Sequence, residues 1–158
     1  MARILIVDDH EVVREGLKML LANLRPEWSI CGEAANGADA VSKTQELRPD
    51  IVLLDISMAG MSGLEACSRM RKLALQTPVL IFTTHDSKQL SEDVREAGAQ
   101  GFVLKTQAVR DLVRAMDTVL AGGTFFGNPE AGQRKIESER QSGGSSLCVG
   151  LRMQLAWV

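Results

Sequence analysis

Five side chains that can bind a metal ion or act on phosphorus follow four short apolar stretches of this chain. The stretches are residues 4–7, 51–54, 79–82 and 101–104, and the side chains that follow them are Asp8 and Asp9, Asp55, Thr83, and Lys105. Continuous apolar runs of this length are typical of buried strands in a parallel sheet. Ligands of such sheets bind just outside the carboxyl ends of the strands. The sequence therefore predicts that three carboxylates, a hydroxyl and an ammonium group meet at one edge.

The chemistry expected of this group starts from its three carboxylates. Carboxylates that lie close together raise one another's pKa, and a divalent cation removes this conflict. Mg²⁺ prefers oxygen ligands, so carboxylates and a backbone carbonyl suit it. With the metal bound, Asp55 can attack phosphorus and form an aspartyl phosphate. Lys105 then neutralises charge on the transferring group, and Thr83 donates a hydrogen bond to the product phosphate.

Each of these residues also has an ordinary structural interpretation. An acidic pair such as Asp8 and Asp9 after a strand most often caps the N-terminus of a helix. Asp55 alone could equally be a structural residue of this kind or part of a site. Thr83 is a β-branched residue of the kind that strands prefer, and a lysine such as Lys105 at a strand end is usually solvated. It is the order of these residues and their shared placement after strands that favour a common site.

Strands and helices alternate over residues 4–120. A segment at residues 28–32 alternates apolar and polar residues, which indicates a second strand near an edge of the sheet. Ser62, with Glu65 three residues later, predicts a capping box at the start of the third helix, and the glycine pair at 122–123 closes the fifth. The pattern predicts an α/β fold with a parallel sheet, right-handed crossovers and helices on both faces. The expected helices are residues 13–24, 38–47, 62–73, 90–97 and 109–120.

The composition is ordinary for a globular protein. Of its 158 residues, 45% are hydrophobic and 24% charged, and the net charge is −2. A net charge near zero, without a long run of one sign, does not favour a nucleic-acid surface. No apolar stretch reaches the roughly 18 residues that cross a bilayer, so a membrane-spanning helix is not expected. We expect no signal peptide, because residues 1–3 lead directly into the first strand. We expect no disulfide framework, because Cys31, Cys67 and Cys148 are odd in number and form no CxxC pair. The chain is therefore predicted to be cytoplasmic.

Residues 127–158 differ from the rest of the chain. They contain five glycines and no alternating pattern, and residues 141–146 read QSGGSS, the composition of a flexible linker. Residues 147–158 include nine apolar side chains, which form either a small docking element or a poorly ordered tail. We therefore predict one folded domain over residues 1–126 and a flexible Gly/Ser-containing tail over residues 127–158.

Four segments of the chain match one known family in residues and in spacing. The segments read IVDDHEVVREGLKMLL, DISMAGMSG, FTTHD and AGAQGFVLK. With them the chain resembles the receiver domain of two-component response regulators, over about Arg3 to Phe126. The opening segment and the GGTFF ending are most similar to the NarL/FixJ (LuxR-type) branch. The resemblance implies a flavodoxin-like (CheY-like) doubly wound sheet of five parallel strands in the order 2-1-3-4-5.

The resemblance also assigns a role to each residue of the predicted site. Asp55 is then the phosphoacceptor, Lys105 pairs with the phosphoryl group, and Thr83 is the switch hydroxyl. Phe102, three residues before the lysine, matches the switch aromatic, although an apolar ring on a strand is also ordinary core. The implied Mg²⁺ ligands are Asp8, Asp9, Asp55 and the backbone carbonyl of Ser57.

These roles imply a signalling switch that catalyses only its own phosphorylation and dephosphorylation. A sensor histidine kinase is the implied partner that supplies the phosphoryl group. Phosphorylation is expected to draw Thr83 toward the phosphate and to let Phe102 turn inward. The surface formed by the fourth helix, the fifth strand and the fifth helix then changes its partner preference, and a homodimer is expected to form through it.

Two features depart from the family pattern. Ala59 follows Met58 where the family usually has proline, which would fix one φ angle of the loop that carries Ser57. We expect this change to tune metal affinity or phosphoryl lifetime rather than to abolish function. LuxR-type relatives carry a C-terminal helix-turn-helix domain, and residues 127–158 are too few for it and show no recognition helix. We therefore expect no DNA binding by this chain.

Other functions stay open at this point. A DNA-binding LuxR-type regulator whose effector domain is missing differs from a stand-alone receiver only in its output. A haloacid-dehalogenase-type phosphatase needs a DxD pair, and Asp8, Asp9 and His10 put the second aspartate at the wrong offset. A dinucleotide-binding enzyme needs a glycine-rich turn after the first strand, and residues 8–14 contain no glycine. His10 and His85 flank the predicted site, and we assign a phosphoryl-donor role to neither.

Overall fold

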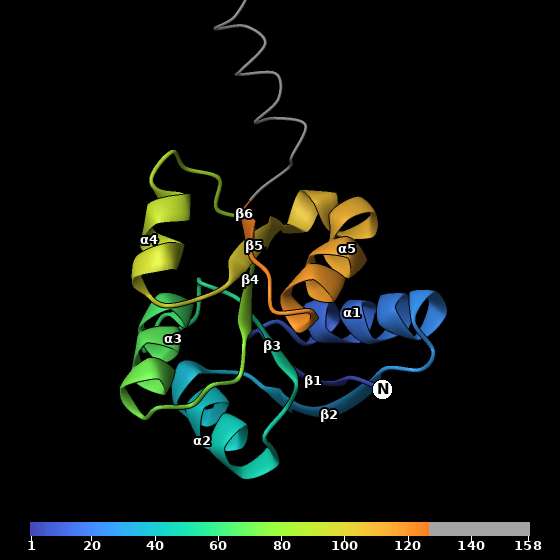
Figure 1. Ribbon diagram of the computed structural model, residues 1–158, viewed down its shortest axis with the longest axis horizontal. Helices are drawn as coiled ribbons and strands as arrows, with labels where there is room; N and C mark the ends of the chain where they lie inside the picture. The colour runs from blue at the N-terminus through green and yellow to red at the C-terminus, as the bar shows by residue number, and fades with distance from the viewer. Residues whose placement is uncertain (127–158) are drawn as a thin grey trace, which may run out of the picture. The chain divides into compact units, whose positions relative to one another are not determined.

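A computed structural model describes residues 1–126 as a parallel sheet with helices on both faces (Figure 1). The predicted flexible tail and the predicted absence of a helix-turn-helix domain both fall on residues 127–158, outside the described residues. The elements in chain order are β1 Arg3–Val7, α1 Glu11–Leu24, β2 Ser29–Ala34, α2 Gly37–Leu47, β3 Ile51–Leu54, α3 Gly63–Lys72, β4 Val79–Thr83, α4 Leu90–Glu96, β5 Gly101–Leu104, the 3₁₀ helix η1 Lys105–Gln107, α5 Ala108–Leu120 and β6 Phe125–Phe126.

The strands lie in the order β2-β1-β3-β4-β5-β6, and every neighbouring pair is parallel. The predicted α/β class and the flavodoxin-like order 2-1-3-4-5 are therefore confirmed. All residues of β3 and β4 are buried, as their continuous apolar sequences predict. β2 is only half-buried, which agrees with its alternating sequence and its place at an edge.

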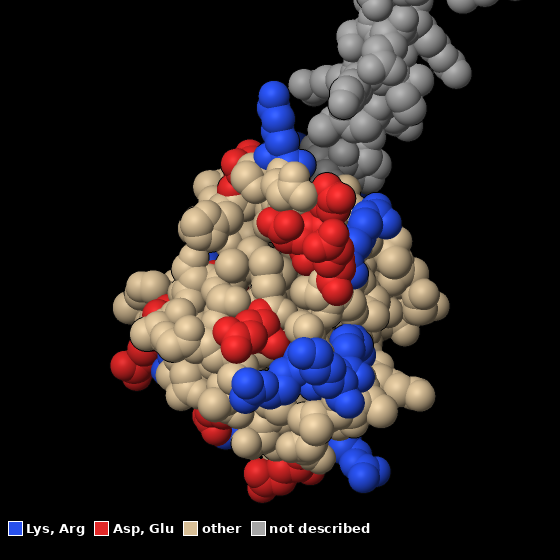
Figure 2. Space-filling view, turned by 90° about the vertical axis from the view of Figure 1, so that its left-hand side faces the viewer, with Lys and Arg blue, Asp and Glu red and all other residues tan. Residues whose placement is uncertain are grey.

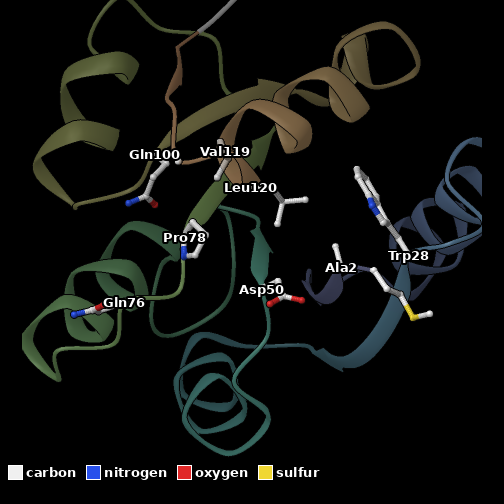
Figure 3. Close-up of a pocket in the computed structure, with 10 residues that line it drawn as sticks. Ala2, Trp28, Asp50, Gln76, Pro78, Gln100, Val119 and Leu120 are labelled. Atoms are coloured by element: carbon white, nitrogen blue, oxygen red, sulfur yellow. The ribbon is translucent and has the colours of Figure 1, made fainter.

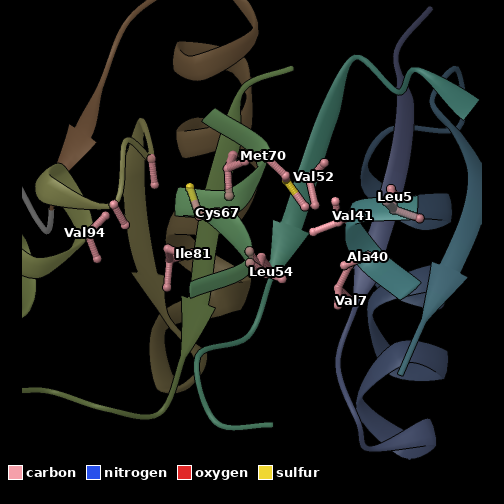
Figure 4. Close-up of a cluster of buried hydrophobic side chains, with 14 of the residues drawn as sticks. Leu5, Val7, Ala40, Val41, Val52, Leu54, Cys67, Met70, Ile81 and Val94 are labelled. Carbon is pink, nitrogen blue, oxygen red and sulfur yellow. The ribbon is translucent and has the colours of Figure 1, made fainter. Parts of the chain in front are cut away.

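Two helical layers cover the sheet and enclose two hydrophobic cores. α1 and α5 lie on one face, and α2, α3 and α4 lie on the other (Figure 1). Because side chains of a strand alternate between faces, each central strand supplies both cores. The core beneath α2, α3 and α4 is drawn in Figure 4, and its labelled members are Leu5, Val7, Ala40, Val41, Val52, Leu54, Cys67, Met70, Ile81 and Val94.

A side-chain cap marks the start of α3 but not that of α1. Ser62 Oγ accepts a hydrogen bond from the Glu65 N–H at 3.2 Å, which confirms the predicted cap of α3. The acidic pair after β1 does not cap α1 in this way. His10 is the N-cap residue of α1 and makes no side-chain cap, while Asp8 Oδ1 accepts from the His10 N–H at 2.9 Å. The carboxylates of this pair are therefore not committed to a helix end.

A sixth strand, β6, was not anticipated from the sequence. It adds two residues to the edge of β5, in register through Gly101↔Phe125 and Phe102↔Phe126. A Cβ added at Gly101 would lie 1.9 Å from the Phe125 carbonyl oxygen. Glycine at position 101 is thus what permits the two backbones to approach. β6 is too short to show a period in the sequence, which is why the predicted sheet had five strands.

Both signs of charge occur on the side of the domain that carries α2, α3 and α4. Figure 2 shows acidic side chains gathered above basic ones on this side. The last turn of α3 contributes Arg69, Arg71 and Lys72, and the first turn of α4 contributes Glu92 and Asp93. This side of the described residues is therefore of mixed charge. Within residues 1–126, no helix has the length and apolar character needed to cross a membrane.

Replacing Gly101 with alanine tests the close approach of β6 to β5. The added methyl must displace the Phe125 carbonyl, so we expect the free energy of unfolding to fall by about 1–3 kcal/mol, the usual cost of overpacking. Gly16→Ala in α1 is the matched control, because a Cβ there meets nothing within 4 Å and alanine favours a helix by about 0.5–1 kcal/mol. Urea unfolding followed by circular dichroism measures both variants. Parent-like stability of Gly101→Ala would contradict the β5–β6 pairing.

Candidate functional site

Four strands bring the predicted side chains to one edge of the sheet. Asp8 directly follows β1 and Asp55 directly follows β3, and these two strands are neighbours. Thr83 is the last residue of β4, and Lys105 directly follows β5. The Asp55 N–H donates to the Val7 carbonyl at 3.0 Å, so the ladder of the sheet continues into the site. The carboxylates therefore stand on a rigid frame rather than on mobile loops.

The ammonium group of Lys105 joins two of the carboxylates. Its Nζ lies 2.6 Å from Asp8 Oδ2 and 3.5 Å from Asp55 Oδ2. Asp8 and Asp55 are only 1% and 3% exposed. Buried charges are tolerated when they are paired and hydrogen-bonded. The ammonium group therefore offsets part of the cost of burying both carboxylates.

Burial controls the ionisation of Asp55. Removal from water raises the pKa of its carboxyl above the usual aspartyl value. The charge of Lys105 acts against this, the charge of Asp8 adds to it, and hydrogen bonds from Lys105 and from the Ser57 N–H lower the pKa. The net direction is upward. Lys105 and the Ser57 N–H thus offset only part of the cost that burial and Asp8 place on the charged form of Asp55.

Asp9 and His10 complete an acidic pocket beside Asp8. His10 Nδ1 lies 2.8 Å from Asp9 Oδ1 and 3.1 Å from Asp8 Oδ1. One ligand atom from each of Asp8, Asp9, His10 and Asp55 lies within 4.8 Å of the other three. Three carboxylates around the single charge of Lys105 leave excess negative charge, and their oxygens are the donors that Mg²⁺ prefers. The residues present therefore fit a magnesium ion.

A chain of hydrogen bonds crosses the rim of the pocket from Ser57 to Thr83. Ser57 Oγ lies 2.6 Å from His85 Nε2, and the His85 N–H donates to Thr83 Oγ1 at 3.1 Å. Thr83 is fully buried, whereas Ser57 and His85 are exposed. Sequence reasoning placed His85 beside the site but missed its contact with Ser57. The two residues are 28 positions apart, and only the pairing of β3 with β4 brings their loops together.

Phe102 is buried on the same face of the sheet as Thr83. In the β4–β5 register it is opposite Ile81, and Thr83 lies two residues further along β4. Residues in this relation are diagonal neighbours on one face. On its other side, Phe102 meets the ring of Phe126 at a centroid distance of 6.3 Å. This position suits a switch aromatic and also a core residue, so the switch role stays a prediction.

Two backbone supports of the site were missed by sequence reasoning. Gly63 packs so closely on the strand-end loop that an added Cβ would lie 1.9 Å from the Asp55 carbonyl oxygen. Arg14 Nη1 donates to the Asp8 carbonyl at 2.7 Å. A glycine that opens a helix shortly after a strand-end aspartate is the signal that could have revealed the first support. Ala59 is exposed in the loop before α3, and its predicted effect on the metal stays a prediction.

A broad groove of about 660 Å³ lies at the opposite edge of the sheet (Figure 3). It is lined largely by apolar or uncharged side chains, which include Ala2, Trp28, Pro78 and Leu120. Its carboxylate, Asp50, accepts a hydrogen bond from the Arg3 N–H at 2.8 Å. Converging reactive groups are found at the acidic edge of the described residues and not in this groove. We therefore take the acidic edge, and not this groove, as the candidate functional site.

Response regulators are among the known proteins that are similar to this chain. A family model described as the response regulator receiver domain matches residues 4–117. The chain is 43% identical over 126 residues to the transcriptional regulatory protein YdfI of Bacillus subtilis. This match covers 80% of the chain and 58% of YdfI. It is 34% identical over 121 residues to the nitrate/nitrite response regulator protein NarL of Escherichia coli. This match covers 77% of the chain and 56% of NarL.

A solved structure shows the same similarity. The two-component response regulator of the LuxR family from Aurantimonas sp. SI85-9A1 is 36% identical, with a TM-score of 0.78. The match covers 88% of this chain and 98% of that one. The chain thus spans little more than half the length of the relatives YdfI and NarL but nearly all of this solved structure.

The raised pKa of Asp55 predicts a pH-dependent cost of folding. The folded state keeps the Asp55 proton to a higher pH than the unfolded state, so the free energy of unfolding falls as pH rises through that interval. We expect Asp55→Asn to be more stable than the parent at pH 7 in metal-free buffer. The gain should shrink as pH falls toward the usual aspartyl pKa of about 4. Urea unfolding with a chelator at several pH values measures this difference, and a less stable Asp55→Asn at pH 7 would show that burial does not dominate.

Proposed function

The chain belongs to the response regulator receiver domain family, and we propose that it is the phosphoacceptor switch of a two-component phosphorelay, with Asp55 as the acceptor. Its relatives are response regulators of the NarL/LuxR type, so the domain is a signalling switch rather than a metabolic enzyme. The observation that carries the proposal is the contact of Lys105 with both Asp8 and Asp55. An ammonium group beside an aspartate favours transfer of a negatively charged phosphoryl group to that aspartate.

The proposed donor is a phosphohistidine of a sensor histidine kinase. An oxygen of the Asp55 carboxylate attacks phosphorus, and the P–N bond breaks. The electrons of that bond return to the donor imidazole, and the product is an acyl phosphate on Asp55. Lys105 neutralises charge on the phosphoryl oxygens as they arrive. Hydrolysis of this acyl phosphate returns the domain to its first state, so the chain catalyses only its own phosphorylation and dephosphorylation.

Asp8, Asp9 and Asp55, with the backbone carbonyl of Ser57, are the proposed ligands of Mg²⁺. When bound, the ion supplies positive charge that offsets the repulsion between the carboxylates and the phosphoryl oxygens. β1 and β3 hold Asp8 and Asp55 in place through the sheet ladder, so these oxygens converge before any ion arrives. Pre-positioned ligands reduce the cost of binding.

Thr83 and Phe102 are the proposed switch residues. The phosphoryl oxygens accept a hydrogen bond from the Thr83 hydroxyl, whose oxygen accepts from the His85 N–H in the present structure. Thr83 moves toward the phosphoryl group, and the Phe102 ring turns toward the space that Thr83 leaves. The surface formed by α4, β5 and α5 contains or adjoins both residues and changes with them. We propose that this surface is also the interface of a homodimer.

The wider role of the protein is part of the same proposal. We place it in the cytoplasm, where a sensor kinase can reach Asp55. The family assignment favours a receiver over a haloacid-dehalogenase-type phosphatase or a dinucleotide-binding enzyme. The expectation that this chain does not bind DNA stays a prediction, which a gel shift at several salt concentrations can test.

Asp55→Asn should abolish phosphorylation. An amide is a poor nucleophile and forms no stable acyl phosphate, so we expect no label to enter the variant from acetyl [³²P]phosphate with Mg²⁺. The parent should take up label, and a chelator should prevent this. Asp50→Asn, at the opposite edge of the sheet, is the matched control and should be labelled like the parent. Label on Asp55→Asn would show that the acceptor lies elsewhere.

Mg²⁺ should stabilise the fold through Asp9. At a free concentration tenfold above Kd, a ligand of the folded state raises the free energy of unfolding by about 1.4 kcal/mol. We expect this gain in the parent and in Asp50→Asn, and a much smaller one in Asp9→Asn. Thermal unfolding with increasing Mg²⁺ measures the gain. An equal response in Asp9→Asn would remove Asp9 from the ligand set.

A further inference from the structure

Phe126 lies between the proposed switch aromatic and a cation. Its ring meets that of Phe102 edge to face, with an interplanar angle of 72°. The guanidinium carbon of Arg95, from α4, lies 3.8 Å from the centroid of the Phe126 ring. Edge-to-face pairs and cation–π contacts are both stabilising. Phe126 therefore links Phe102 to α4 through two favourable contacts of its ring.

The backbone of β6 fixes the place of this ring. Phe126 is opposite Phe102 in the β5–β6 register, and Phe125 is opposite Gly101. Because successive side chains of a strand point to opposite faces, the two rings of β6 lie in different cores. Phe125 packs in the core beneath α1 and α5, with Arg114 at 5.5 Å from its ring centroid. The chain thus offers neighbouring phenylalanines of which only one touches Phe102.

Phe102 stands between Phe126 and the acidic site. On the β4 side its diagonal neighbour is Thr83, whose hydroxyl is held by the His85 N–H. On the β6 side its neighbour is Phe126. A Phe102 ring that turns toward Thr83 must move away from Phe126 and lose the edge-to-face contact. The two neighbours therefore compete for one ring.

We propose that Phe126 is a positioning residue that holds Phe102 in its present conformation and so opposes the phosphorylated state. This inference rests on the proposed roles of Asp55, Thr83 and Phe102. Coupling between two sites is reciprocal, so occupation of Asp55 by a phosphoryl group weakens the docking of Phe126 by the same factor. The state of Asp55 is thereby coupled to the docking of β6, the last strand of the described residues.

Beryllofluoride, a mimic of the phosphoryl group, provides the test in the presence of Mg²⁺. The whole chain is labelled with fluorophenylalanine, which replaces its four phenylalanines, and ¹⁹F NMR follows the titration. Phe126→Leu keeps an apolar side chain on β6 but lacks the aromatic contacts. We expect it to bind beryllofluoride about threefold to tenfold more tightly than the parent, the effect of losing one aromatic pair. Phe126→Tyr restores the ring and should bind like the parent.

Phe125→Leu is the matched control, because it alters the same strand on the other face. A purely structural loss of β6 docking would affect both leucine variants alike, whereas positioning predicts tighter binding in Phe126→Leu alone. In the parent, the resonances of Phe102 and Phe126 should shift together as beryllofluoride is added. Unchanged or weaker binding by Phe126→Leu, or an equal gain in Phe125→Leu, would overturn the inference. Failure of the parent to bind beryllofluoride would instead overturn the proposed function, with Asp55→Asn as the non-binding reference.

Discussion

The ion pair of Lys105 with Asp8 and Asp55 is the interaction on which the rest of the site depends. Two carboxylates lie almost out of contact with water at the ends of adjacent strands, and burial alone disfavours their charge. Lys105 leaves β5 and reaches past the end of β4 to both of them. This contact needs β1, β3 and β5 to end at the same height, which the parallel register provides. The order of the strands is therefore an electrostatic requirement as well as a packing solution.

Two glycines allow the backbones at this sheet to approach as closely as the geometry requires. Gly63 lets the start of α3 rest on the Asp55 carbonyl, so the loop that follows Asp55 is supported by a helix end. Gly101 lets β6 lie against β5 next to Phe102. In each case a methyl group would meet backbone atoms, which cannot rotate away as a flexible side chain can. Gly63 thus positions the loop that follows Asp55, and Gly101 positions β6 beside Phe102.

The sequence predicted the sheet well because its strands are buried on both faces and read as uninterrupted apolar runs. It also predicted which side chains meet, since residues that follow parallel strands share an edge. It could not predict that Lys105 pairs with Asp8 more closely than with Asp55, because that choice depends on side-chain reach in three dimensions. The contact of Ser57 with His85 was missed for the same reason. β6 was missed because two residues show no periodicity and their pairing depends on a glycine 24 positions away.

Shared use of one ammonium group links metal and phosphoryl binding in the proposed switch. Lys105 Nζ lies 2.6 Å from Asp8 Oδ2. A phosphoryl group on Asp55 would carry more negative charge than the carboxylate and would attract the same ammonium group more strongly. Asp8 would then be left buried with less compensation, which is costly unless another cation replaces Lys105. Mg²⁺ held by Asp8 and Asp9, as proposed above, would meet that need. Because such coupling is reciprocal, a bound metal ion would free Lys105 for the phosphoryl group by the same factor as a phosphoryl group would favour the metal. The short Lys105–Asp8 distance therefore argues that the two ligands bind this pocket as a pair rather than independently.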